Sequence, residues 1–173
     1  MKLKQNESTY VAPKAGLTHG VITAVIDTGS APNKFRDDEM QRQLMIEWTL
    51  PKQTNEGEPL NISKWFTASI HEKSNLYGLI TDLGITIVGE YDLFDLLGVN
   101  CMVNITEFTK DNGDKKMNVS SVAPLMEEME AVTLPTRKLD LNAFSEDDWS
   151  QLSEGIQKLI MKSPEYKELT GGM

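Results

Sequence analysis

WFTASIHEKSNLYGLITDLG, residues 65–84, decides the fold, because a strand pattern passes directly into a helix pattern within it. Its first part ends an alternating run over residues 61–70. From Ser69 or His71 onward, leucines and an isoleucine recur at helical spacing as far as Leu83, and Gly84 is the expected stop. The strand presents two faces: Phe66, Ala68 and Ile70 on the apolar one, and Ser63, Trp65, Thr67 and Ser69 on the other.

Alternating apolar and polar residues predict four more strands, which lie on both sides of this stretch. Asn112-Gly113 is a strong hairpin signal and makes the last two strands antiparallel neighbours. The predicted strands are Leu17–Asp27, Gln41–Leu50, Val99–Phe108 and Lys116–Val122, with a second short helix at Tyr91–Leu97. In the first strand, one face is expected to carry Ile22, Ala24 and Ile26, and the other Val21, Thr23 and Val25. In the second strand, one face carries Leu44, Ile46, Trp48 and Leu50, and in the fourth the inward residues are Cys101, Val103 and Ile105.

The chain order is therefore strand, strand, strand, helix, strand, strand, which is the order of an OB-fold. We expect a mainly β protein: a five-stranded OB-fold barrel with a helix between strands 3 and 4, plus a C-terminal helical extension. Ser145 is a good helix N-cap, an apolar stripe from Trp149 to Ile160 follows it, and Pro164 limits the helix. The expected organisation is an N-terminal arm (1–15), the OB-fold domain (16–125), an acidic linker (126–144) and a C-terminal amphipathic helix with a tail (145–173).

The composition and net charge of the chain limit the classes of function that it can have. The chain has 173 residues, 39% of them hydrophobic, with no apolar run of the roughly 18 residues that span a membrane. Its N-terminus lacks the apolar region of a secretory signal, and a lone cysteine, Cys101, excludes an internal disulfide, so a cytoplasmic location is expected. The net charge of −9 argues against a purely electrostatic nucleic-acid binder. Residues 126–173 hold 10 acids against 5 lysines and arginines, so the excess is concentrated there.

Catalytic and metal-binding patterns are weak. His19 and His71 lie far apart and are not paired with cysteine, no glycine-rich loop follows a strand, and no triad pattern occurs. The consecutive acids Asp37, Asp38 and Glu39 do not share a face, so we interpret them as solvated surface, with a nuclease site as the rival interpretation. We expect no enzyme, no metal and no cofactor.

OB-folds bind ligands across strands 2 and 3, flanked by the loops that join strands 1–2 and strands 4–5. Trp65 on the outward face of strand 3, with Lys64 beside it, suits stacking on bases, and Lys73 could contact a phosphate where the strand meets the helix. The alternative is that Trp65 packs under the linker or the C-terminal helix. The expected nucleic-acid-binding residues are Trp65, Phe35, Lys34, Arg36, Lys64, Lys73, Lys110, Lys115 and Lys116.

Three motifs give the chain a resemblance to a known family: W-x-T-x-S-x-H-E-K-S-x-L over residues 65–76, DLLG over 95–98 and C-x-V-N-I over 101–105. Over residues 16–125 the chain resembles phage-encoded OB-fold single-stranded-DNA-binding proteins. The resemblance implies non-catalytic, sequence-tolerant binding of single-stranded DNA in phage replication or recombination, in the cytoplasm of the infected bacterium. The further partners it suggests are phage or host replication and recombination proteins and a second copy of the chain, with no membrane.

Two features depart from that picture. The tail ELTGGM lacks the acidic, aromatic-tipped end that many such proteins use to recruit partners. The negative net charge favours a rival interpretation, an OB-fold protein-interaction adaptor in a replication or assembly complex.

Overall fold

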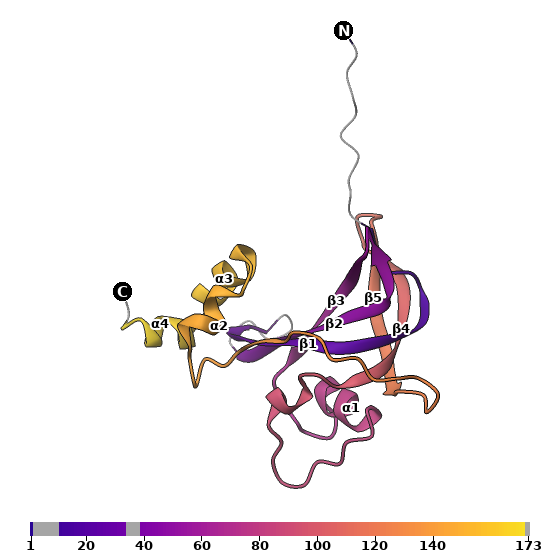
Figure 1. The fold of residues 1–173 in the computed structure, drawn as a ribbon. Coiled ribbons are helices and arrows are strands. Elements are labelled where there is room, and N and C mark those ends of the chain that lie inside the picture. Colours follow the sequence, from indigo (N-terminus) through magenta and orange to yellow (C-terminus); the bar gives the residue numbers. More distant parts are fainter. Residues whose placement is uncertain (2–10, 34–38, 172–173) are drawn as a thin grey trace.

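The computed structural model describes residue 1 and residues 11–33 and 39–171, and this part of the chain is mainly β with a few short helices (Figure 1). The strands are β1 (Gly16–Pro32), β2 (Met40–Asn55), β3 (Glu58–Thr67), β4 (Asn100–Thr109), β5 (Lys115–Pro124) and β6 (Arg137–Leu139). The helices are α1 (Asn75–Asp82), η1 (Leu93–Leu96), α2 (Glu146–Ser150), α3 (Glu154–Met161) and α4 (Pro164–Leu169). In the chain, α1 and the single 3-10 turn η1 lie between β3 and β4.

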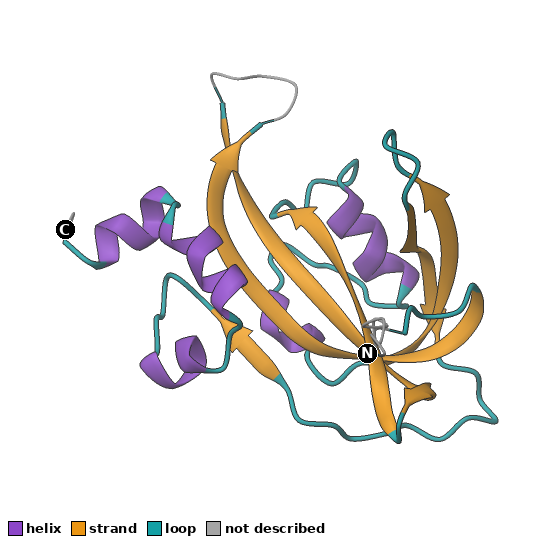
Figure 2. Ribbon diagram, turned by 90° about the horizontal axis from the view of Figure 1, so that it is seen from above, coloured by secondary structure: helices purple, strands orange, loops and turns teal. Residues whose placement is uncertain are grey.

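The six strands form one curled sheet in the order β3-β2-β1-β4-β5, with neighbours antiparallel, and β6 pairs in parallel with β1 (Figure 2). The prediction of a closed five-stranded barrel is wrong. Between the edge strands β3 and β5, the structure gives a side-chain contact in place of a backbone ladder: Lys64 Nζ donates to the carbonyl oxygen of Val119 at 2.7 Å. The sheet is therefore open along this seam.

The prediction that Ile22, Ala24 and Ile26 share one face of β1 is also wrong. Its register against β2 shifts between Ile22 and Ala24, and again between Asp27 and Gly29. A bulge adds one residue to one strand and so reverses which side chains face inward beyond it. Ile22 therefore packs with Trp48, whereas Ala24 and Ile26 lie on the opposite face.

Two apolar clusters fill the two faces of the sheet. The inner cluster lies on the face toward α1 and contains the predicted rows of β2 and β4, which are confirmed. The outer cluster lies on the other face, where residues after β5 cover β1 and β2. Its buried members are Ala24, Ile26, Met45, Leu139, Leu141, Leu152 and Ile160.

The C-terminal segment forms three short helices where one was expected. Ser153 and Ser163 each cap a new helix with the side-chain oxygen, and Pro164 occupies the first turn of α4. Trp149 stacks on Tyr166 with ring centroids 5.0 Å apart. Because the helix is interrupted at these capping serines, the apolar residues of the C-terminal segment pack against the sheet as three short helices instead of one long helix.

One carboxylate ties this segment to the sheet. Asp27 accepts two hydrogen bonds from Arg42, at 2.8 and 2.6 Å, one from the backbone N–H of Leu141 at 3.0 Å and one from that of Gly29 at 3.1 Å. The hydrogen bond to Asp27 raises the pKa of Arg42, against the opposing effect of burial. Within the described ranges, no helix is long and apolar enough to cross a membrane.

Candidate nucleic-acid interface

Trp65 lies on the outer face of β3 with 44% of its surface exposed. It is directly opposite Met45 on β2, which in turn is opposite Ile26 on β1, so the three side chains form one row across the sheet. Ile26 and Met45 are buried in the outer cluster, and Trp65 is not. The cover formed by the C-terminal segment therefore ends between β2 and β3, and the alternative in which Trp65 packs under it does not hold.

The surroundings of Trp65 are polar. Its neighbours along the strand on the same face, Ser63 and Thr67, are both exposed. Ser63 is opposite Glu47 and Thr67 is opposite Gln43. An exposed ring bordered by small hydroxyl side chains leaves its face open to a flat partner such as a base.

Lys64 does not share this surface. It lies in phase with Ile62 and Phe66, which belong to the inner cluster, and its ammonium reaches across the seam to Val119. The ammonium also lies 5.8 Å from the centroid of the Phe66 ring. Burial lowers the pKa of Lys64. Its place is the seam between β3 and β5, away from the outer face on which the sequence analysis put it.

The β4–β5 hairpin gathers three of the expected cations. Lys110, Lys115 and Lys116 are all exposed, and Lys115 pairs with Glu107 at 3.6 Å. Phe108 lies directly opposite Lys116 and is 45% exposed. The sequence analysis did not identify this aromatic residue, although it lies two residues after Thr106 and on the same, outer side of β4. An exposed ring beside a cation is a second place where a base and its phosphate could be held.

The remaining expected residues are separated from these two surfaces. Lys34, Phe35 and Arg36 lie outside the described residues, as do Asp37 and Asp38 of the rival nuclease interpretation. Lys73 is exposed in the turn before α1, where its backbone N–H donates to His71 Nδ1 at 3.2 Å. Ser74 caps α1 through its side chain, so the helix begins a few residues after the predicted start at Ser69 or His71.

The segment between β5 and β6 covers a further part of the outer face. Asn100 Oδ1 accepts from the backbone N–H of Val132 at 2.8 Å and lies 2.7 Å from Nε2 of the buried His19. Farther on, Arg137 forms an ion pair with Glu47 at 2.7 Å. The outer surface left open therefore includes β3 with the adjoining edge of β2, the start of β1 at Leu17 and the β4–β5 hairpin.

The open surface offers exposed aromatic rings and lysine side chains. Among residues 11–33 and 39–171, no three histidines, cysteines or acids are grouped to hold a metal ion. Cys101 is buried in the inner cluster, and burial raises the pKa of its thiol to about 12, with an opposing interaction from the Trp48 side chain.

Comparison of the sequence with known proteins found no protein-family model and no curated protein that matches the chain.

Proposed function

We propose that this protein binds single-stranded DNA without catalysis and with little sequence preference. The observation that carries the proposal is the exposure of Trp65. Its indole is 44% exposed, whereas Met45 and Ile26, which lie beside it in the same row across the sheet, are buried. Every base has a face on which an aromatic ring can stack, so such contacts tolerate any sequence. Phe108 and the hairpin cations Lys110, Lys115 and Lys116 would extend the path along the strand.

The strand order supports an OB-type topology. In that topology β1 lies between β2 and β4, a helix follows β3, and single strands cross the outer face of β2 and β3. Here β1 pairs with both β2 and β4, and α1 follows β3 in the chain. The motif resemblance to phage single-strand binders further supports a role in phage replication or recombination, in the cytoplasm of the infected host, with other replication proteins or a second copy as partners.

Fluorescence anisotropy with a labelled oligo-dT tests the proposal. Trp65→Ala should weaken binding by about 1–3 kcal/mol, which is about 5- to 150-fold in Kd. Leu159→Ala is the control, because Leu159 is an apolar residue of similar exposed fraction, 40%, on α3 rather than on the proposed interface. Replacing Lys110, Lys115 and Lys116 together by alanine should make the salt dependence shallower, by a slope of about 2 for three lost phosphate contacts. Equal Kd values for Trp65→Ala and Leu159→Ala would remove Trp65 from the site.

An OB-fold adaptor for protein partners is the second candidate, and the net charge of −9 favours it. The segment after β5 brings exposed acids, among them Glu127, Glu128 and Glu130, to the molecule's surface. A wild-type protein that binds neither oligo-dT nor duplex DNA at low salt would favour the adaptor. Binding of oligo-dT that falls steeply with salt would favour the DNA binder.

A further inference from the structure

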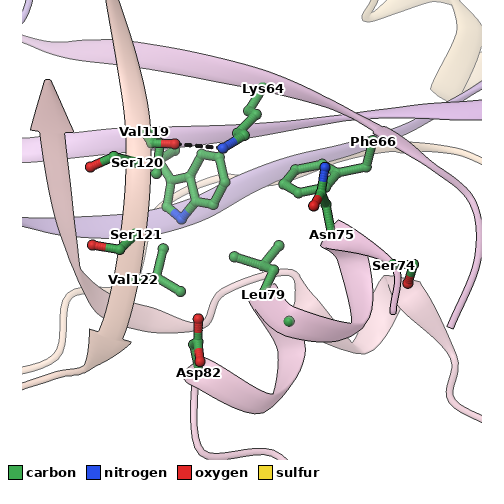
Figure 3. Close-up of a pocket in the computed structure, with 12 residues that line it drawn as sticks. Lys64, Phe66, Ser74, Asn75, Leu79, Asp82, Val119, Ser120, Ser121 and Val122 are labelled. Atoms are coloured by element: carbon green, nitrogen blue, oxygen red, sulfur yellow. Dashed lines mark hydrogen bonds between the residues drawn. The ribbon is translucent and has the colours of Figure 1, made fainter. Parts of the chain in front are cut away.

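The seam between β3 and β5 contains a pocket of about 280 Å³ that the proposed function does not use. We call it the seam pocket. It is bounded by Lys64 and Phe66 of β3, residues 119–122 of β5 and one face of α1 (Figure 3). This volume is near the lower end of those of small-molecule sites, so the seam pocket admits one small ligand rather than a length of polymer.

The two ends of the seam pocket differ in charge. Lys64 and Asn75, the first residue of α1, lie toward one end, and Asp82, its last residue, lies toward the other, with Leu79 between them (Figure 3). The first turn of α1 carries no acidic side chain, so the partial positive charge of the helix start is not offset there. Lys64 uses one of its three N–H donors on Val119 and has two more for a ligand. The pocket thus suits a ligand with an anion at one end and hydrogen-bond donors at the other.

Gly78 gives a position at which the seam pocket can be narrowed without a clash. It lies within α1 and lines the seam pocket, and a Cβ built on it would meet no atom within 4 Å. Glycine inside a helix destabilises the fold relative to alanine. Packing within the described chain does not require glycine here, since a methyl group would fit. A methyl group would, however, project into the pocket and reduce the room for a ligand.

We propose that the seam pocket binds one nucleoside monophosphate unit, with the phosphate at Lys64 and the start of α1 and the base edge at Asp82. Phe66, Leu79, Val119 and Val122 give the walls that an aromatic base needs, and Ser121 adds a hydroxyl. Guanine presents adjacent N–H donors to a carboxylate, so dGMP should bind better than dTMP. The unit is either a free mononucleotide or the terminal nucleotide of a strand. The proposal does not depend on the binding of DNA at Trp65.

The test compares two glycine variants of the full chain. Gly155 lies in α3, and a Cβ there also meets no atom within 4 Å, so Gly155→Ala is matched to Gly78→Ala in helix chemistry. Both variants should have a higher Tm than the wild type. In isothermal titration with dGMP, Gly78→Ala should bind about tenfold more weakly or worse, because the added methyl crowds the ligand, and Gly155→Ala should match the wild type.

Further arms identify the ligand and its source. Deoxyguanosine and inorganic phosphate should each bind more weakly than dGMP, since each lacks one end of the unit. A 5′-phosphorylated oligonucleotide that competes with dGMP better than its unphosphorylated form would assign the site to a strand end, whereas equal competition would assign it to the free nucleotide. Trp65→Ala should bind dGMP like the wild type, so this proposal and the proposed function fail separately. Absence of dGMP binding, or equal binding by Gly78→Ala and Gly155→Ala, would overturn the inference.

Discussion

Asp27→Asn should be the most destabilising conservative change outside the apolar clusters. The Asp27 side chain is 14% exposed and that of Arg42 29%, and two hydrogen bonds join them. The asparagine would keep one acceptor oxygen and turn an amide group toward the donors of Arg42, Leu141 or Gly29. Arg42 would then retain its charge in a partly buried place, with only the electrostatic effect of Glu165 and Asp140 to offset it.

The magnitude follows from these contacts. Breaking a fully buried ion pair by removing one partner costs about 3–5 kcal/mol, and hydrogen bonds to charged groups contribute about 1.5–3 kcal/mol each without adding fully. Because Arg42 remains partly open to water, we expect a loss of about 2–4 kcal/mol in the free energy of unfolding. A decrease of this size is a large fraction of the stability of a typical domain.

Urea denaturation measures the loss, and Glu107→Gln is its control. Glu107 pairs with Lys115 at 3.6 Å, with the two side chains 49% and 70% exposed, so its loss should cost about 0.5 kcal/mol or less. Limited proteolysis gives a second readout, since Asp27 also holds the backbone of Leu141 and its loss should expose residues after β5 to cleavage first. Asp27→Asn within about 1 kcal/mol of the control, with unchanged proteolysis, would refute the reasoning.

Two further predictions concern the clusters. Leu139→Ala should lower the free energy of unfolding by about 2–5 kcal/mol in urea denaturation, because Leu139 is fully buried in the outer cluster. Leu159→Ala is the control and should cost about 1 kcal/mol or less, because Leu159 is 40% exposed. Equal losses for the two variants would contradict the packing described. Burial raises the pKa of Cys101 from 9.0 to about 12, so the folded state keeps a proton that the unfolded chain loses. Stability should therefore fall as pH rises from about 9 toward about 12, and Cys101→Ala should show a smaller decline between about pH 7 and pH 10.5.

Alternation predicted the inward rows of β2 and β4, even though the pairing of β4 with β5 shifts between Asn104 and Ile105. The Asn112-Gly113 turn joins β4 to β5 as expected. In β1 the same rule failed beyond Ile22, because a bulge has no period by which sequence could reveal it. The short β6 was missed because three residues are too few for a periodic signal, and its partner strand lies more than a hundred residues earlier.

The candidate site shows a similar division. Trp65 was placed on the outer face by its phase in β3, and its exposure bears this out. Lys64, one residue earlier, had to face inward by the same alternation, so the signal was present and was outweighed by its closeness to Trp65 in sequence. Phe108 escaped notice because it lies near the end of its strand, where exposure depends on how far the neighbouring strand extends.

The cover on the outer face gives the strongest reason to look for a partner at Trp65. The chain forms several buried contacts over Ile26 and Met45, with Leu139, Leu141 and Ile160 fully or almost fully buried. Covering one more residue in the same row would remove the indole from water, and burial of an aromatic side chain is worth about 1.5–3 kcal/mol. The cover stops short of that residue, and the strand beside it carries small hydroxyl side chains. An intramolecular packing role would favour continuing the cover, so the exposed indole supports the proposal that Trp65 stacks on a base.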